Sequence, residues 1–148
     1  MTLTDVLEKD LVKVPLQATT KNEIIEELVD VLVKARRLHN REEILAAVLA
    51  REALGSTGLA DGVAVPHAKT AAVTSVSVVM GITPKPIDFD AQDGKGSQFF
   101  FLVLAPEKES SAYIEVLVSI ARATSSPVMR RLLASARSSD DVMRFFMD

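Results

Sequence analysis

The sequence predicts an α/β or α+β fold in which a sheet of four or five strands lies between helical layers. Residues 98–105 (QFFFLVLA) are nearly all apolar, which is typical of a central strand buried on both faces. Residues 75–82 (SVSVVMGI) are rich in β-branched side chains and predict a second strand. Segments with apolar residues at helical spacing lie both before and after these two strands.

The N-terminal part of the chain predicts a short strand followed by a helix. Residues 11–16 (LVKVPL) alternate apolar and polar side chains, and Pro15 favours a place at the edge of the sheet. Thr20 precedes Glu23 by three residues, a spacing typical of a capping box at the start of a helix. Apolar residues at helical spacing then continue for about four turns.

A second helix is expected to begin at Asn40, with a carboxylate three residues later at Glu43, and to end near Gly55. Residues 55–62 (GSTGLADG) contain three glycines and predict a loop. Residues 63–66 then predict a short extended segment that ends at His67.

The remaining elements are a long connection and three more helices. Residues 83–97 are rich in Pro, Asp and Gly, so they are expected to link the two strands without regular structure. After the second strand, helices are expected to begin at Ser110 or Ser111, at Pro127 and at Ser138.

The composition fits one domain over residues 1–148 and excludes several classes of protein. Hydrophobic residues make up 48% and charged residues 25%, so the chain is too apolar to be disordered. A net charge of −3 argues against nucleic acid as a partner. The absence of cysteine excludes a disulfide scaffold, a thiolate metal site and a cysteine nucleophile.

The sequence also argues against insertion into a membrane. No apolar run is long enough to span a bilayer. The N-terminus has acidic residues early and lacks the positive start and apolar core of a signal peptide. We therefore expect a cytoplasmic protein.

His67 is the strongest candidate for chemistry. It follows Pro66, which restricts the backbone, and it lies near a Gly-Ser-Thr-Gly loop and the cation of Lys69. A neutral imidazole with hydroxyls and a cation nearby suits a nucleophile that accepts an anionic group. The spacing alone also fits a histidine that merely ends a strand.

Other candidate sites are weaker. His39 is expected to be an exposed residue near the end of a helix. The two histidines lie far apart without a His-Glu-x-x-His pattern, so no metal site is predicted. Asp88, Asp90 and Asp93 fit solvated turn residues better than catalytic acids.

The glycine-rich loop does not fit a nucleotide site or a serine hydrolase. It lacks the Gly-Lys-Ser/Thr ending of a P-loop, and its glycines miss the dinucleotide spacing. Ser56 does not stand in a Gly-x-Ser-x-Gly elbow. The loop could be a turn with left-handed glycines or a cradle for an anion.

Taken together, several motifs resemble the enzyme IIA component of the bacterial phosphotransferase system, of the fructose/mannitol type that includes the nitrogen-regulatory branch. The combination of R-E-x-L-G-S-T-G with x-P-H-x-K is highly specific, and the similarity extends over nearly the whole chain. The motifs are residues 51–58 (REALGSTG), 65–70 (VPHAKT), 87–91 (IDFDA), 93–95 (DGK) and 101–106 (FLVLAP).

The resemblance implies an α/β fold with a mixed sheet of about five strands between helical layers. It implies that His67 accepts a phosphoryl group from the histidine-containing phosphocarrier protein and that Arg51 stabilises that group. The protein would be a phosphotransferase component that works through a phosphohistidine intermediate, with little turnover by itself. No metal or organic cofactor is expected. Weaker contacts with the phosphoryl group are expected from Ser56, Thr57, Gly58 and Lys69.

The sequence departs from the family at one position. Family members usually carry a second histidine at the start of the helix after the Ala-Pro strand end, and Tyr113 stands at that place here. A tyrosine hydroxyl can donate a hydrogen bond to phosphate or to His67. It cannot carry a proton at neutral pH as an imidazole does. The departure therefore leaves acceptance by His67 intact and puts onward transfer in question.

The resemblance leaves two functions open. In regulation, which the replacement by Tyr113 favours, the phosphorylation of His67 would change binding to a target protein through added charge. In sugar import, the phosphoryl group would pass to the cytoplasmic cysteine domain of a transporter. In either case we expect a modest apolar patch around His67 for transient docking.

Overall fold

The computed structural model describes residues 1–147 and contains a five-stranded sheet. The elements along the chain are α1 (Leu3–Val6), the 3-10 helix η1 (Lys9–Leu11), β1 (Val12–Lys13), α2 (Lys21–Arg36), α3 (Arg41–Ala53), β2 (Val63–Ala64), β3 (His67–Lys69), β4 (Ser77–Ile87), β5 (Ser97–Ala105), α4 (Ser111–Thr124), α5 (Pro127–Ser135) and α6 (Ser139–Met147).

The sheet is mixed, as expected. The strand order is β1-β4-β5-β2. Strand β3 also pairs with β5, at residues further along that strand than those that pair with β2. Strand β5 runs antiparallel to β4 and parallel to β2 and β3, while β1 runs parallel to β4. Strand β1 lies at the edge, in agreement with the expectation from Pro15.

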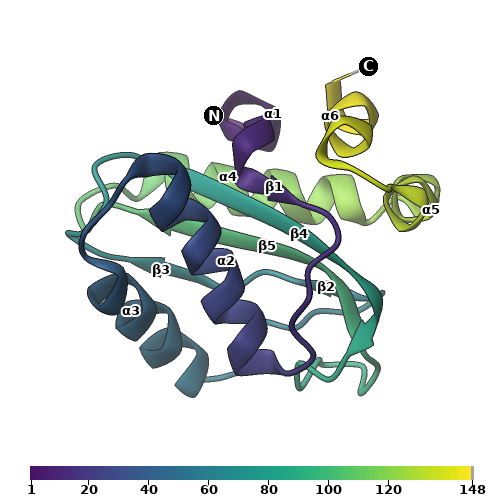
Figure 1. The fold of residues 1–148 in the computed structure, drawn as a ribbon, viewed down its shortest axis with the longest axis horizontal. Coiled ribbons are helices and arrows are strands. Elements are labelled where there is room, and N and C mark those ends of the chain that lie inside the picture. Colours follow the sequence, from purple (N-terminus) through teal and green to yellow (C-terminus); the bar gives the residue numbers. More distant parts are fainter. Residues whose placement is uncertain (148) are drawn as a thin grey trace.

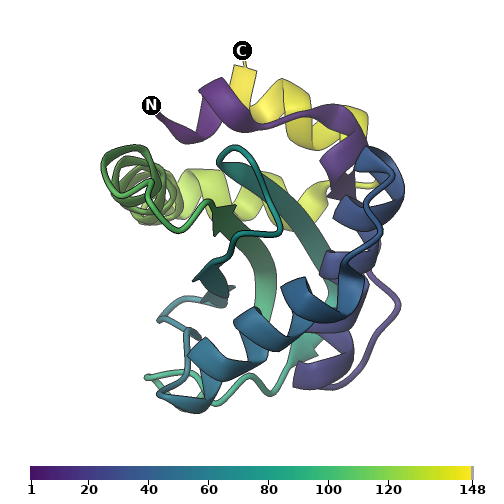
Figure 2. The same ribbon diagram turned by 90° about the vertical axis from the view of Figure 1, so that its left-hand side faces the viewer.

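Helices cover both faces of the sheet, which confirms the predicted α/β fold. Helices α2 and α3 pack on one face, and α4 lies behind the other, together with α1, α5 and α6 (Figure 1). Turning the molecule by 90° shows the N-terminal segment and α6 side by side at one end (Figure 2). An ion pair between Lys9 and Asp140, 2.8 Å apart, joins these two segments.

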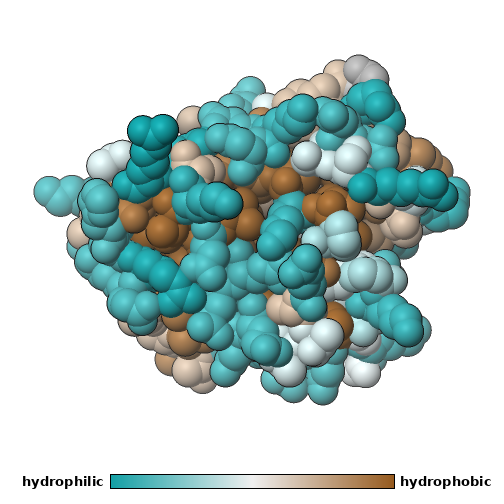
Figure 3. All heavy atoms as spheres, viewed as in Figure 1, coloured by the Kyte–Doolittle hydropathy of each residue, from teal (hydrophilic) through white to brown (hydrophobic). Residues whose placement is uncertain are grey.

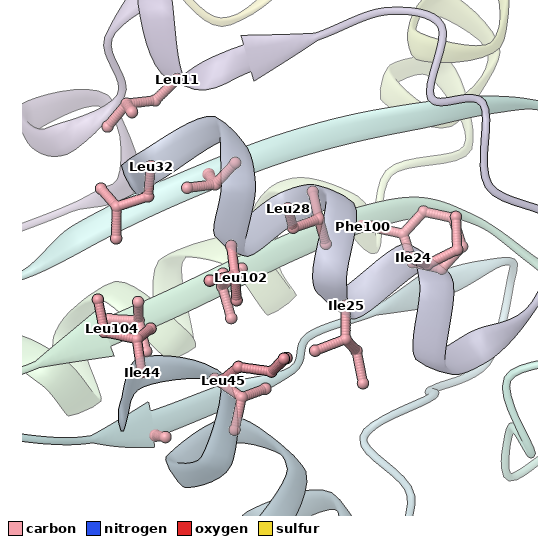
Figure 4. Close-up of a cluster of buried hydrophobic side chains, with 14 of the residues drawn as sticks. Leu11, Ile24, Ile25, Leu28, Leu32, Ile44, Leu45, Phe100, Leu102 and Leu104 are labelled. Atoms are coloured by element: carbon pink, nitrogen blue, oxygen red, sulfur yellow. The ribbon is translucent and has the colours of Figure 1, made fainter. Parts of the chain in front are cut away.

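Strand β5 is the centre of the core, because its side chains alternate between the two helical layers. Phe100, Leu102 and Leu104 face α2 and α3, where Figure 4 shows them opposite Ile24, Leu28 and other apolar residues of those helices. On the opposite side of the strand, Phe99, Phe101 and Val103 face α4. The predicted central strand, buried on both faces, is therefore confirmed.

The surface over α2 and α3 is mostly polar. Figure 3 shows hydrophilic residues over most of this face, with apolar atoms visible in smaller patches between them. Within residues 1–147 no helix is long and apolar enough to cross a membrane.

The two predicted helix starts near the N-terminus are correct, but they are capped differently. The hydroxyl of Thr20 accepts the backbone N–H of Glu23 at 3.4 Å, as the capping motif predicts. The side chain of Asn40 does not cap α3. Its Nδ2 instead donates to the carbonyl of Ala72 at 3.1 Å and ties the start of α3 to the loop after β3.

The first strand is shorter than predicted. Only Val12 and Lys13 belong to β1, whereas the alternation of apolar residues extends over residues 11–16. Pro15 has no N–H to donate to a ladder, which ends regular pairing. The backbone contact resumes at Leu16, whose N–H donates to the carbonyl of Ile82 at 2.8 Å.

The expected connection over residues 83–97 is wrong in its first part. Strand β4 continues to Ile87, and the turn that follows it is correspondingly short. The pairing with β5 is irregular between Ile82 and Ile87, the stretch that contains Pro84 and Pro86. Both prolines are exposed. Proline has no N–H to donate to a neighbouring strand, and the irregular pairing in this stretch does not require one.

Candidate functional site

His67 occupies the first position of β3, so the expectation that it ends a strand is wrong. Pro66 interrupts the extended segment and separates β2 from β3. The carbonyl of Pro66 accepts the N–H of Val103 at 3.0 Å, which fixes this point of the chain on the central strand. Ala68 packs among α2 and α3, so His67 lies on the face of α4.

The imidazole of His67 has a defined tautomer. Its Nδ1 lies 2.7 Å from the carbonyl oxygen of Val65. A carbonyl oxygen only accepts, so Nδ1 carries the hydrogen and Nε2 keeps its lone pair. Burial lowers the pKa of His67, and the charge of Arg51 reinforces that shift. The bond to Val65 and the charge of Glu52 oppose it. The half-buried ring is therefore neutral at neutral pH.

A cavity of about 230 Å³ adjoins His67. Its lining comes from the end of α3, the loop after it, the residues around β3, the turn after β4 and helix α4. The lining residues are Arg51, Ser56, Thr57, Leu59, Val65, His67, Gln92, Leu117 and Ala121.

Arg51 brings a positive charge to this cavity. It stands in the last turn of α3, and its Nη1 donates to the carbonyl of Gly55 at 2.9 Å. Among residues 1–147 it forms no ion pair with an acidic side chain, and a guanidinium has five N–H donors. The remaining donors can bind an anionic group beside His67.

The loop residues 56–58 are held by bonds within the protein. Ser56 donates its hydroxyl to the carbonyl of Phe89 at 2.7 Å and accepts the N–H of Gly58 at 3.0 Å. Thr57 donates both its N–H and its hydroxyl to the carboxylate of Glu52. These contacts fix the shape of the cavity wall.

Gly58 permits a close approach between two loops. A Cβ at this position would lie 2.9 Å from the Cα of Ala91, and the carbonyl of Gly58 accepts the N–H of Gln92 at 3.2 Å. The loop after α3 thus packs directly on the turn after β4, and this packing brings Gln92 to the cavity.

Tyr113 lies beside His67. The two ring centroids are 6.0 Å apart, with the planes tilted by 59°. Burial raises the pKa of Tyr113 to about 12, with a smaller opposing effect of Arg51, so its hydroxyl keeps its hydrogen at neutral pH. Among residues 1–147 no protein group accepts that hydrogen.

Lys69 is not among the residues that line the cavity, but it contacts Tyr113. Its Nζ is 5.4 Å from the centre of the Tyr113 ring and donates to the hydroxyl of Ser110 at 2.7 Å. The cation is therefore held by the start of α4, next to the ring that neighbours His67.

Exposed apolar side chains lie on the two helices that contribute to the cavity. Leu54 at the end of α3 is 84% exposed, and Ile114 and Val118 on α4 are 56% and 42% exposed. These three residues are called the apolar rim below.

The other candidates lie elsewhere. His39 is exposed between α2 and α3, and Asp88, Asp90 and Asp93 are exposed in the turn after β4. Within the described part of the chain, no group of three or more His, Asp or Glu side chains could hold a metal ion.

Two site features were missed by sequence reasoning. Glu52, whose carboxylate holds Thr57, stands in the R-E-x-L-G-S-T-G motif, and an acid in that motif was the available signal. Gln92 carries no such signal, because it reaches the cavity only through the packing of two loops. The arrangement as a whole combines a neutral imidazole nucleophile with a guanidinium, which suits transfer of an anionic group.

Comparison with curated proteins gives relatives over nearly the full chain. The chain is 32% identical to the fructose-specific EIIABC component of Bacillus subtilis over 97% of its own length, but it spans only 22% of that relative. It is 33% identical to the fructose-specific EIIA component of Haloferax volcanii, covering 90% of this chain and 86% of that protein.

Solved structures also include proteins that match nearly the full chain. The nitrogen regulatory protein IIA-Ntr of Neisseria meningitidis superposes with a TM-score of 0.88 at 30% identity, covering 97% of this chain and 98% of that one. IIA mannitol of Escherichia coli, solved in complex with phosphorylated IIB mannitol, gives a TM-score of 0.78 at 26% identity, covering 94% of this chain and 95% of that one.

The family model described as phosphoenolpyruvate-dependent sugar phosphotransferase system, EIIA 2, matches residues 5–148. The match includes every element of the cavity around His67, from the end of α3 to helix α4. The chain therefore belongs to the EIIA 2 family of the sugar phosphotransferase system.

Proposed function

We propose that this protein is a phosphoryl carrier in which Nε2 of His67 accepts the phosphoryl group. The observation that carries this proposal is the bond between Nδ1 of His67 and the carbonyl of Val65, 2.7 Å apart. It leaves the lone pair of a neutral ring on Nε2, and burial keeps the ring neutral by lowering its pKa.

The transfer step is a displacement at phosphorus. The lone pair of Nε2 forms the new N–P bond, while the bond between phosphorus and the donor's ring nitrogen breaks and returns its electron pair to the donor. His67 keeps its hydrogen on Nδ1, so the phosphorylated ring is an imidazolium, and the carbonyl of Val65 stabilises its positive charge. Transfer between two histidines is nearly balanced, so alignment and charge neutralisation are the main requirements.

Arg51 neutralises the phosphoryl oxygens, since its planar fork suits their geometry. The hydroxyl of Tyr113 donates a further hydrogen bond to the group, because its pKa of about 12 keeps it protonated. Ser56, Thr57 and Gly58 contribute mainly by shaping the cavity, and Lys69 adds positive charge from the side of α4.

The donor is the histidine-containing phosphocarrier protein of the cytoplasm, and residues 1–148 act as a single EIIA-type domain. The donor docks on the apolar rim, whose exposed side chains lie on the same two helices that bring Arg51 and Leu117 to the cavity. A patch of this kind suits a transient complex that forms and dissociates quickly.

The phosphorylated protein serves regulation or sugar transport. Tyr113 favours regulation, because a group that does not titrate near neutral pH cannot exchange a proton during onward transfer. The alternative, transfer to the cytoplasmic domain of a fructose- or mannitol-type transporter, is supported by the likeness to IIA mannitol in its complex with phosphorylated IIB mannitol.

The proposal is tested by intact mass after incubation with phosphoenolpyruvate and the general carriers of the system. The wild type should gain the mass of one acid-labile phosphoryl group, and His67→Ala should gain none. His39→Ala is the matched control, since it removes the only other histidine, and it should be labelled like the wild type. Labelling of His67→Ala would disprove the assignment.

The two functions are separated by adding a cysteine-bearing transporter domain to the phosphorylated protein. Rapid loss of the label to that domain supports transport. A stable label, together with altered binding to a target protein, supports regulation.

A further inference from the structure

Glu52 is a buried carboxylate one residue after Arg51. Its exposed fraction is 7%, and burial of a carboxylate is costly unless its oxygens are satisfied. Three donors do so: the N–H of Thr57 at 2.9 Å, the hydroxyl of Thr57 at 2.6 Å and the ammonium of Lys21 at 2.9 Å.

From Thr57 the bonding continues to the imidazole. The carbonyl of Thr57 accepts the N–H of Val65 at 3.0 Å, and the carbonyl of Val65 accepts Nδ1–H of His67 at 2.7 Å. Glu52 and His67 are thus joined indirectly, through one residue of the loop and one residue of the extended segment.

The other end of this chain of bonds is firmly held. Lys21 stands in the first turn of α2, and its Nζ also lies 3.4 Å from Asp90 and 5.0 Å above the ring of Phe89. Glu52 therefore ties the start of α2 and the turn after β4 to the loop that carries Thr57.

We propose that Glu52 is a positioning residue for phosphoryl acceptance: through Thr57 and Val65 it fixes the tautomer and the orientation of the His67 ring. This inference rests on the proposed function for its kinetic consequence. A free imidazole samples both neutral tautomers, and only the one with its lone pair on Nε2 can attack through that nitrogen. If the carbonyl of Val65 shifts, the ring loses the acceptor that selects this tautomer.

The test compares Glu52→Gln with Glu27→Gln, which is a closely matched control. Glu27 on α2 also accepts two backbone N–H groups, those of Gln17 and Ala18, and its carboxylate lies 2.7 Å from the ammonium of Lys13. Its side chain is 12% exposed, against 5% for Glu52, and it does not line the cavity beside His67. Both substitutions remove one negative charge and leave an amide of the same size.

Two readouts are needed. Long-range ¹H–¹⁵N correlation of the His67 ring, at a pH well above its pKa, reports which nitrogen carries the hydrogen. The rate of phosphoryl acceptance, measured over a range of donor concentrations, separates the maximal rate from the apparent KM for the donor.

We expect folded Glu52→Gln to show ring shifts between those of the two tautomers. Its maximal rate should be about tenfold lower with an unchanged KM, as expected if about a tenth of the rings keep the reactive tautomer and orientation. Glu27→Gln should keep the wild-type shifts and rate. Wild-type shifts and rate in folded Glu52→Gln would overturn the proposal, as would equal effects of the two substitutions.

If Glu52→Gln does not fold, a pair of substitutions at Thr57 decides the question. Thr57→Val removes the hydroxyl that donates to Glu52, and Thr57→Ser keeps it. Mixed tautomers in Thr57→Val with recovery in Thr57→Ser support the proposal, and no difference between the two overturns it. The ring shifts are read without any transfer, so an inactive wild type would refute the proposed function while leaving the positioning role testable.

Discussion

The ring of Tyr113 lies 6.0 Å from the ring of His67, centre to centre, with the two planes tilted by 59°. Burial raises the pKa of Tyr113 to about 12, so its hydroxyl keeps its hydrogen and can donate it at any physiological pH. Beside the proposed phosphoryl acceptor, Tyr113 therefore supplies a hydrogen-bond donor and not a group that titrates near neutral pH.

Tyr113→Phe should slow phosphoryl acceptance about tenfold, because one hydrogen bond to a charged group is removed while the ring remains. Stopped-flow or quench-flow labelling with the phosphorylated donor measures this rate. Tyr113→His should make onward transfer depend on pH between about 6 and 8, where a histidine titrates. An unchanged rate in Tyr113→Phe would show that the hydroxyl takes no part.

Acceptance should depend on pH through His67 itself. Burial lowers the pKa of the ring, so the neutral nucleophile persists to lower pH than for a free histidine. The rate should be constant at neutral pH and fall only below about 6.5, the ordinary pKa of histidine. A pH–rate profile with its midpoint above that value would contradict the burial of the ring.

The same shift predicts a pH-dependent stability. At a pH between the folded and the unfolded pKa of His67, the unfolded chain binds more protons, so the free energy of unfolding decreases as pH falls. Urea unfolding of the wild type and of His67→Gln across this range measures the effect. The difference between the two proteins should shrink or reverse as pH falls below about 6.5.

Arg51→Lys should lower the rate of acceptance by about tenfold or more, because an ammonium cannot match the two-donor geometry of a guanidinium on phosphate. It should have little effect on thermal unfolding, since the hydrogen bond that it removes within the protein is the one to the carbonyl of Gly55. Wild-type kinetics in folded Arg51→Lys would show that the guanidinium takes no part in transfer.

Ile114→Asp on the apolar rim should raise the apparent KM for the donor and leave the maximal rate unchanged, because it affects docking and not the reacting atoms. Val128→Asp is the matched control, since both residues are 56% exposed on helices and Val128 lies on α5. Equal KM values for the two variants would place the docking surface elsewhere.

Much of the fold could be predicted from the sequence because local patterns agreed with tertiary packing. The run that ends at Ala105 was correctly predicted as a central buried strand, and Thr20 and Pro127 marked helix starts that the structure confirms. The prediction failed where tertiary contacts override local preference. Pro84 and Pro86 continue β4 through a bulge against β5, which no pattern within residues 83–97 indicates.

Some features of the site could likewise be predicted from the sequence, and others could not. His67 and Arg51 could be proposed from short motifs, because each motif is local in sequence, and the structure brings both to one cavity. The carbonyl of Val65 as partner of Nδ1 and the place of Gln92 in the cavity depend on how the chain packs locally, so the sequence alone did not indicate them. Glu52 had a signal in the R-E-x-L-G-S-T-G motif, but its bonds to Thr57 are known only from the structure.

The central claim, that Nε2 of His67 takes up the phosphoryl group while Nδ1 keeps its hydrogen, is tested most directly by ¹⁵N and ³¹P NMR of the phosphorylated protein. We predict nitrogen–phosphorus coupling at Nε2 of His67 and a hydrogen retained on Nδ1. Coupling at Nδ1, or phosphorus on any other residue, would contradict the claim.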